Sequence, residues 1–152
     1  MSRYELAPTS HIVAGQGSRE ALGEVAASLT GPHGKAILVA DPGLQASGMI
    51  DEISAVLGKK LGVVEVFSAF YGDPTIAQTD AAAKLARDSE AGVIVALGGG
   101  SALDLGKAVA AIANENGSAL DYEFGKRDFP VRSLPVICVP TTSGTGSETT
   151  RT

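Results

Sequence analysis

Short, nearly unbroken apolar runs recur along the chain and alternate with longer segments of mixed polarity. Each run ends at a glycine, a proline or a polar turn residue. Such runs are typical of strands in a parallel sheet, because both faces of a parallel sheet are usually buried. The pattern predicts strands at residues 36–40, 63–67, 93–97 and 134–139.

The segments between these runs carry apolar residues at helical spacing. Leu22, Val25, Ala26 and Leu29 fall on one face of a helix. Residues 102–113 are apolar on nearly every side, which predicts a buried helix. The spacing predicts helices over residues 20–29, 45–58, 75–89 and 102–113.

The alternation of strands and helices predicts an α/β fold. We expect a Rossmann-like parallel sheet with helices on both faces. Residues 1–19 are expected to form a strand or hairpin at the edge of the sheet, and residues 117–132 to form a polar loop. The length of 152 residues fits a single domain, residues 1–152.

Charge and cysteine content narrow the partners of this domain. The net charge of −5 argues against a nucleic-acid or membrane-surface partner. No apolar run is long enough for a transmembrane helix, and residues 1–5 lack the core of a signal peptide, so a cytoplasmic location is expected. Cys138 is the only cysteine, which excludes an intrachain disulfide and favours a buried thiol.

Each unusual loop follows a predicted strand. The parallel arrangement places the carboxyl ends of all strands at one edge of the sheet, where α/β proteins bind their ligands. The sequence therefore predicts a site at this edge. It would be built from the loops 41–43, 72–74, 98–101 and 141–146.

Three consecutive glycines, Gly98, Gly99 and Gly100, precede Ser101 at the predicted start of a helix. The spacing fits neither the nucleotide P-loop nor the usual dinucleotide fingerprint. Glycines nevertheless let an anion approach the backbone, and the bare N–H groups of a helix start attract it. Ser101 is expected to cap the helix, with Asp104 three positions on. A tight turn without a ligand is the alternative interpretation.

Two acidic residues follow other strands. A carboxylate at Asp41 is suited to accept hydrogen bonds from an adenine ribose and to repel a 2′-phosphate, which favours NAD over NADP. Asp41 also fits an ordinary Asp-Pro-Gly turn equally well. Asp73, before Pro74, has the same two interpretations, and there the turn is favoured.

Near the end of the chain, Thr145-Gly-Ser-Glu148 matches a capping box and predicts the start of another helix. A single turn of helix is not stable alone, so we expect the chain to be part of a longer protein. The face left by a missing domain is expected to be apolar and to favour self-association.

Together, LVADPG, GGGSALDLGK and PTTSGTGSE resemble the iron-containing (group III) alcohol dehydrogenases. The resemblance covers nearly the whole chain and implies the N-terminal nucleotide-binding domain of that family, without its helical metal-binding domain. It implies that the glycine turn with Ser101 holds the pyrophosphate of the cofactor and that Asp41 binds the adenosine ribose. Many members carry Asn where Asp73 stands.

The resemblance also assigns the remaining polar residues. It places Asp104 near the site and gives Lys107 a structural or supporting role. The implied cofactor-lining residues after the last strand are Thr141, Thr142, Thr145, Gly146 and Ser147.

The chemistry implied by the resemblance is hydride transfer between an alcohol and a nicotinamide cofactor. In the family, iron or sometimes zinc polarises the alcohol oxygen, and one Asp and three His of the second domain bind this metal. His11 and His33 lack a metal-ligand spacing, so this chain is expected to bind no metal and to hold no catalytic residue.

Two alternatives remain open at this stage. The domain could belong to a glycerol dehydrogenase, maleylacetate reductase or dehydroquinate synthase relative, although the PTTSGTGSE form favours the alcohol dehydrogenase branch. The chain could instead be a non-catalytic scaffold or interaction module. The expected truncation supports this second alternative, and the intact cofactor motifs argue against it.

Overall fold

A four-stranded parallel sheet forms the centre of the molecule, with the strand order β2-β1-β3-β4. The structure is a computed structural model that describes residues 11–128, 130 and 132–150. All three strand pairs are parallel. The strands are β1 (Lys35–Ala40), β2 (Val63–Phe67), β3 (Val93–Gly98) and β4 (Val136–Pro140).

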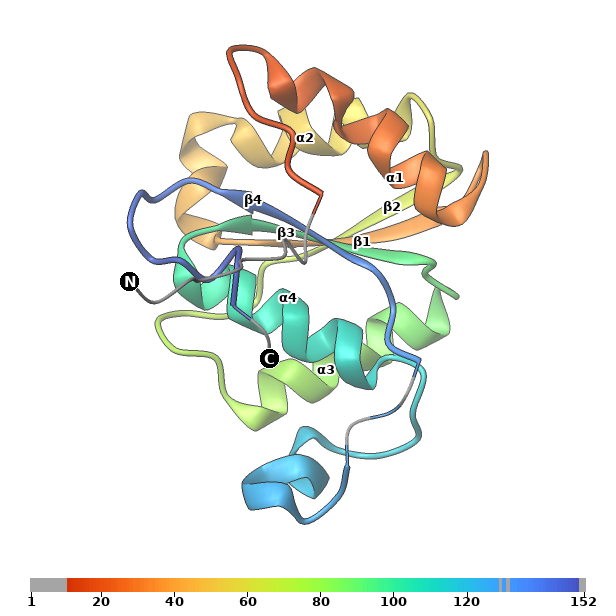
Figure 1. Ribbon diagram of the computed structural model, residues 1–152, viewed down its shortest axis with the longest axis vertical. Helices are drawn as coiled ribbons and strands as arrows, with labels where there is room; N and C mark the ends of the chain where they lie inside the picture. The colour runs from red at the N-terminus through yellow and green to blue at the C-terminus, as the bar shows by residue number, and fades with distance from the viewer. Residues whose placement is uncertain (1–10, 129, 131, 151–152) are drawn as a thin grey trace, which may run out of the picture.

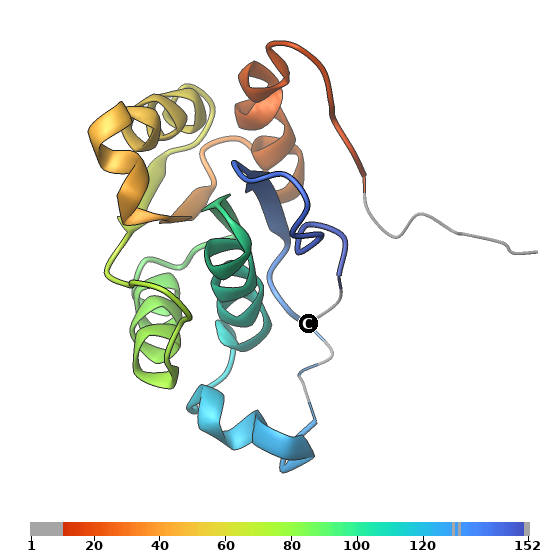
Figure 2. The ribbon, with the colours of Figure 1, turned by 90° about the vertical axis from the view of Figure 1, so that its left-hand side faces the viewer.

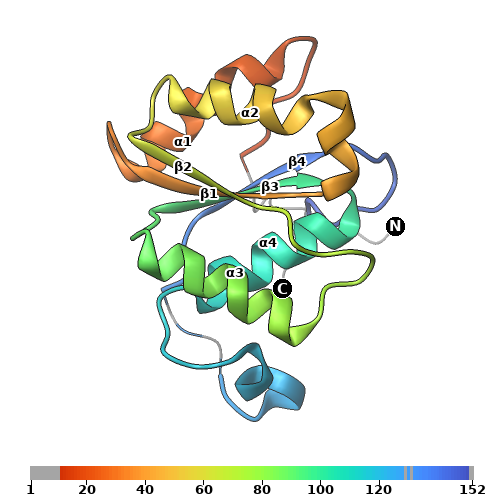
Figure 3. The same cartoon turned by 180° about the vertical axis from the view of Figure 1, so that it is seen from behind.

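Helices cover both faces of this sheet. Helices α1 (Leu22–Thr30) and α2 (Met49–Gly58) pack on one face, and α3 (Ile76–Asp88) and α4 (Gly100–Ile112) pack on the other (Figures 1 and 3). The predicted α/β fold with a doubly covered parallel sheet is confirmed.

Burial on both faces of the sheet explains why β3 is apolar throughout and β1 is apolar from Ala36 onward. Alternate residues of β1 point to opposite faces: Ile37 and Val39 join the core beneath α3 and α4, while Leu38 and Ala40 join the core beneath α1 and α2. All of them are fully buried. Burial of an aliphatic side chain contributes about 1.5–3 kcal/mol, so these two strands anchor the domain.

The four helices begin within four residues of their predicted starts, and two of these starts show what sets them. The second predicted helix begins at Met49 and is preceded by a 3₁₀ helix, η2 (Pro42–Ser47). Gly48 separates the two with φ of 75°, a conformation that an α-helix cannot continue through. Helix α3 begins after Thr75, which forms a reciprocal capping box with Gln78.

Three sequence-based expectations need correction. Residues 11–17 form no strand, and a short 3₁₀ helix, η1 (Ser18–Ala21), follows them; residues 1–10 of the predicted hairpin lie outside the described residues. The predicted polar loop contains a 3₁₀ helix, η3 (Ala119–Gly125). The segment after Thr145 forms turns up to residue 150 instead of the start of a helix.

Helix η3 is held against α3 by a single carboxylate. Asp80 Oδ2 accepts a hydrogen bond from Ser118 Oγ at 2.6 Å, and Oδ1 accepts one from the Ala119 N–H at 2.7 Å. Contacts with a residue distant in sequence therefore order a segment that its composition indicates to be a loop. Within the part of the chain that the structure describes, no helix is long and apolar enough to cross a membrane.

Candidate functional site at the carboxyl edge of the sheet

The loops that follow the strands meet at one edge of the sheet. The strand pairs align Ala40 with Leu97 and Gly98 with Pro140, so the strands end side by side. Backbone bonds join the first residues beyond them: the Asp41 N–H donates to the Leu97 carbonyl and the Thr141 N–H to the Gly98 carbonyl, each at 2.9 Å. Figure 2 faces this edge.

A small cleft opens between three of these loops. Its volume is about 250 Å³, slightly below the roughly 300–1,000 Å³ of pockets for drug-sized ligands. A whole dinucleotide therefore exceeds the cleft and would extend beyond it. The lining residues are Asp41, Pro42, Gly43, Phe70, Tyr71, Gly72 and Ser101.

All three glycines have close neighbours within the protein, and at Gly98 these neighbours exclude a side chain. Gly98 has φ of 148°, and a Cβ there would lie 2.8 Å from Asp41 Cβ and 2.7 Å from Ala102 Cβ. A Cβ on Gly99 would lie 3.1 Å from Thr142 Oγ1, and one on Gly100 would lie 3.2 Å from Ser147 Oγ. The glycines thus let the segment after β4 pack onto the start of α4, so their presence alone does not indicate a phosphate.

The amino-terminal end of α4 is the feature suited to an anion. The helix begins at Gly100 after Gly99, and no side chain caps it. Its first N–H groups and its dipole are therefore available to attract negative charge. The predicted cap at Ser101 is wrong, because Ser101 already lies inside the first turn, beside the cleft.

Asp41 lines the same cleft as the first turn of this helix. It caps η2, and its Oδ1 accepts a hydrogen bond from the Gly43 N–H at 2.8 Å. The turn interpretation of Asp41 is therefore confirmed. The residue is also half-exposed and lines the cleft, so the geometry leaves its carboxylate accessible to a ligand.

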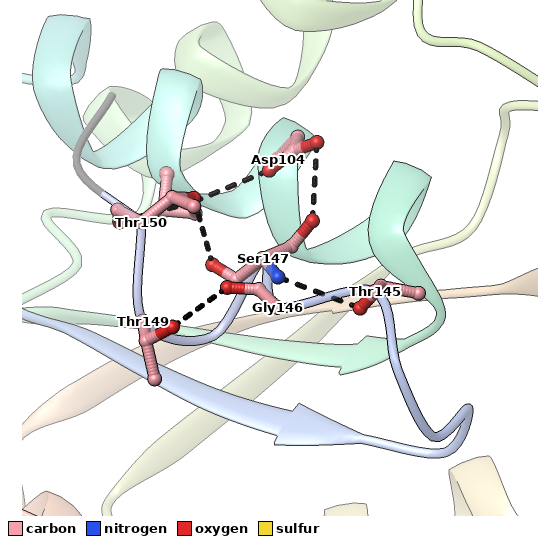
Figure 4. Close-up of polar contacts among 7 residues, drawn as sticks. Asp104, Thr145, Gly146, Ser147, Thr149 and Thr150 are labelled. Carbon is pink, nitrogen blue, oxygen red and sulfur yellow. Dashed lines mark hydrogen bonds and ion pairs between the residues drawn. The ribbon is translucent and has the colours of Figure 1, made fainter.

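The segment 141–150 folds back over the first turns of α4 (Figure 4). Ser147 is buried, and its Oγ donates to Asp104 Oδ2 at 3.4 Å. Thr145 Oγ1 accepts a hydrogen bond from the Ser147 N–H at 3.4 Å, and Thr141, Thr142 and Thr145 are exposed. The segment thus presents hydroxyl groups next to the uncapped helix start.

Asp104 and Lys107 extend this contact along α4. The Lys107 Nζ lies 3.2 Å from Asp104 Oδ1 and donates to Thr150 Oγ1 at 2.7 Å. The carboxylate of Asp104 is more than half exposed, whereas Lys107 is buried. The sequence motif placed both residues on one helix, but the contact of Lys107 with Thr150 needed the fold.

The other predicted and missed residues are placed as follows. Asp73 is exposed in the bend before α3 and does not line the cleft. Phe70 and Tyr71 do line it, and sequence reasoning missed both. Their position just before the Gly-Asp-Pro break, after a predicted strand, was the available signal.

The edge differs from the larger hollow elsewhere on the molecule. That hollow, of about 490 Å³, is lined by residues of η1 and α2. Arg19 and Glu52 form an ion pair there at 2.9 Å. Side chains of both charges line this hollow, so it does not favour a ligand of one charge. We therefore favour the cleft at the strand ends, where the uncapped start of α4 attracts an anion.

A metal site is not formed by the described residues. Within the described ranges, no group of three or more His, Cys, Asp or Glu side chains could hold a metal ion. His33 lies in the loop between α1 and β1, at the other edge of the sheet. The described side chains therefore offer no set of ligands that fits a metal ion.

Comparison with known proteins identifies the family. The sequence pattern of the iron-containing alcohol dehydrogenases matches residues 8–152. The chain belongs to the iron-containing alcohol dehydrogenase family. It is 34% identical to long-chain-alcohol dehydrogenase 1 of Geobacillus thermodenitrificans (strain NG80-2) over 152 residues, which is 99% of this chain and 38% of that protein.

Solved structures of this family share the fold. The crystal structure of sulfoacetaldehyde reductase from Bifidobacterium kashiwanohense, in complex with NAD⁺, matches with a TM-score of 0.86 and 31% identity, covering 99% of this chain and 39% of that one. The NADH-dependent butanol dehydrogenase A of Thermotoga maritima matches with a TM-score of 0.82 and 28% identity, covering 96% and 36%. The chain thus spans less than half the length of these iron-containing alcohol dehydrogenase relatives.

Proposed function

We propose that residues 1–152 are the NAD-binding domain of an iron-containing alcohol dehydrogenase-type oxidoreductase. The observation that carries the proposal is the pairing, across one cleft, of an accessible carboxylate at Asp41 with the uncapped start of α4. A dinucleotide needs both features, one for its ribose hydroxyls and one for its pyrophosphate. The NAD⁺ complex of the sulfoacetaldehyde reductase supports the choice of cofactor.

Each predicted site residue takes a role in this proposal. The pyrophosphate lies over the helix start formed by Gly98, Gly99, Gly100 and Ser101, and Asp41 accepts hydrogen bonds from the adenosine ribose. Asp104 supports the Ser147 hydroxyl. Asp73, which lies outside the cleft, contacts the part of the cofactor that extends beyond it. The residues proposed to line the cofactor after β4 are Thr141, Thr142, Thr145, Gly146 and Ser147.

The reaction proposed for the longer enzyme is hydride transfer between an alcohol and its aldehyde or ketone. NAD supplies the hydride acceptor, and the domain orients it and covers its phosphates. The metal and its ligands belong to parts of the enzyme outside this chain, so we expect the chain to bind NAD without turnover.

Calorimetric titration with NAD and NADP tests the proposal. We expect saturable NAD binding and weaker NADP binding, because the Asp41 carboxylate repels a 2′-phosphate. Asp41→Ala should weaken NAD binding by roughly 10–100-fold, the loss expected when hydrogen bonds to a charged group are removed, and should reduce the preference over NADP. Asp88→Ala, with the same charge change on an exposed ion pair of α3, is the control.

A folded chain without NAD binding would contradict the proposal. It would favour the alternative of a non-catalytic scaffold, and size-exclusion chromatography would then test for self-association. Equal binding of NAD and NADP, unaffected by Asp41→Ala, would instead contradict the role given to the carboxylate.

A further inference from the structure

We propose that Lys107 is a positioning residue of the cofactor site, which holds the segment 141–150 over the start of α4 through Thr150 and Asp104. The inference rests on the proposed function, because the site it concerns is the one proposed for NAD. It assigns a role to Lys107, which is not among the residues proposed to contact the cofactor.

Lys107 is a buried cation that has both hydrogen-bond acceptors and a carboxylate as partners. Its side chain is only 8% exposed, and lysine is almost never buried without partners. Nζ donates to Thr150 Oγ1 at 2.7 Å and to the Thr150 carbonyl oxygen at 3.3 Å, and it lies 3.2 Å from Asp104 Oδ1. Two of the three donors of the ammonium group are thus used by Thr150, and the Asp104 carboxylate pairs with its charge.

The contacts of Lys107 with the segment 141–150 lie at the carboxyl end of that segment. At its start, the Thr141 N–H is bonded to the Gly98 carbonyl, and residues 141–145 are then exposed. The attachments to α4 come later, where Ser147 Oγ donates to Asp104 and where Lys107 binds Thr150. Asp104 contacts both Ser147 and Lys107, so one carboxylate links the two attachments.

Turns within the segment transmit this anchoring back towards the helix start. The Thr150 hydroxyl donates to the Ser147 carbonyl at 3.3 Å, and the Thr149 hydroxyl donates to the Gly146 carbonyl at 2.9 Å (Figure 4). Holding Thr150 therefore holds Ser147 and Gly146 as well. Gly146 and Ser147 directly follow the exposed residues 141–145.

The position of the segment 141–150 determines which hydroxyl groups lie beside the proposed pyrophosphate site at the start of α4. Thr142 Oγ1 lies 3.1 Å from where a Cβ of Gly99 would be, and Ser147 Oγ lies 3.2 Å from that of Gly100. A segment that moves away would remove these hydroxyls from the helix start. Loss of the Lys107 contacts should thus lower the population of the arrangement that binds NAD, and the measured affinity should fall by the same factor.

The test compares Lys107→Met with Lys84→Met in the whole chain. Both substitutions remove one positive charge, but Lys84 pairs with Asp88 on the exposed side of α3. We expect NAD to bind about tenfold more weakly to Lys107→Met, with faster hydrogen exchange in residues 141–150 and unchanged exchange in β3. Lys84→Met should match the wild type in both measurements.

A second pair of variants covers the case in which Lys107→Met fails to fold. Thr150→Val removes the hydroxyl that accepts from Lys107, whereas Thr30→Val removes a hydroxyl that donates to the Ala26 carbonyl within α1, at the other edge of the sheet. We expect Thr150→Val to weaken NAD binding roughly threefold more than Thr30→Val.

Two results would overturn the inference. NAD binding of Lys107→Met or Thr150→Val equal to that of its control would show that the segment is not positioned through Lys107. Faster exchange without a change in NAD affinity would reduce Lys107 to a purely structural role. A wild-type chain that binds no NAD would contradict the proposed function as well, so the two failures are distinguishable.

Discussion

Single residues at the carboxyl edge serve the fold and the proposed cofactor together. Asp41 uses Oδ1 to cap η2 and still lines the cleft. Gly98 combines a positive φ with the close approach of Asp41 and Ala102, so any side chain there would shift Asp41 itself. The local requirements of the chain thus fix the place of the carboxylate before any ligand binds.

Cys138 is expected to be an unreactive thiol. Burial raises its pKa, and the carboxylates of Glu148 and Asp104 add to this effect, which the Lys107 ammonium group partly opposes. A raised pKa leaves less thiolate at any given pH, and the thiolate is the nucleophile. At pH 8 the folded chain should react with iodoacetamide at least about tenfold more slowly than the chain in urea, and faster as the pH rises. Equal rates in both states would contradict this.

At the residue scale, the sequence predicted which loops carry chemistry but not how their side chains are bonded. The Asp-Pro-Gly turn and the glycine run were visible because each follows an apolar strand. The expected cap at Ser101 was wrong, since the helix begins at Gly100, two residues earlier than such a cap requires. The burial of Lys107 depends on Thr150, which is distant in sequence, and no local pattern reports such a contact.

At the scale of elements, α4 is the helix that links the core to the site. Its buried residues pack against β3 and α3, while its first turn faces the cleft. Arg87 of α3 donates to the carbonyl oxygens of Ile112 at 3.3 Å and Glu115 at 2.9 Å, at the other end of α4. The helix is therefore fixed at both ends, which favours a constant position of its amino-terminal end.

Gly106 is expected to be required for the packing of α4 on β3. A Cβ at this position would lie 2.5 Å from Ala96 Cβ, in the fully buried centre of the sheet. Alanine gains about 1 kcal/mol in helix propensity over glycine, but overpacking a core costs about 1–3 kcal/mol, and so close a contact places the cost near the upper end. Gly106→Ala should lower the free energy of unfolding in urea by about 1–2 kcal/mol.

Gly58→Ala is the matched control for this prediction. Gly58 ends α2, and nothing lies within 4 Å of a Cβ placed there. The substitution should stabilise the chain by about 0.4–1 kcal/mol, because it reduces the entropy of the unfolded state. A Gly106→Ala variant as stable as Gly58→Ala would contradict the proposed contact between α4 and β3.

The elements themselves were largely predictable from the sequence. All four strands were expected within two residues of their observed bounds, because β3 is apolar throughout and the other three strands are nearly so. The 3₁₀ helices η2 and η3 were missed, since short helices have no clear periodicity and depend on caps such as Asp41 and Ser118. The capping box at Thr145 did not produce a helix in the described residues.

On the scale of the whole molecule, the edge where the strands begin and the edge where they end differ in their backbone conformations and in the helix ends that face them. The edge where the strands begin holds the strained positions His33 and Glu90, with φ of 62° and 54°. Lys35 pairs with Glu90 there and lowers the pKa of that carboxyl, mainly through their hydrogen bond. No anion-binding helix start faces this edge from α3 or α4, because both helices run back towards it with their carboxyl ends.

The sequence of this chain predicts a cofactor site but not the substrate or metal contacts of the longer enzyme proposed above. The chain spans 38% of the length of the long-chain-alcohol dehydrogenase it resembles. Motifs at Asp41, Gly98–Ser101 and Thr141–Ser147 indicated a cofactor site, since a dinucleotide is bound by loops of one sheet edge. Among the described residues, no group of His, Cys, Asp or Glu side chains could hold a metal ion, so no pattern in the chain points to one.

The most direct test of this account is hydrogen exchange of the chain with and without NAD. The proposal predicts that NAD protects the amides of residues 41–43, 98–102 and 141–147, which border the cleft and the start of α4. Residues 31–34 and 89–92, at the opposite edge of the sheet, should exchange at the same rate in both samples. Protection at that opposite edge, or no protection at the strand ends at saturating NAD, would contradict the proposed cofactor site.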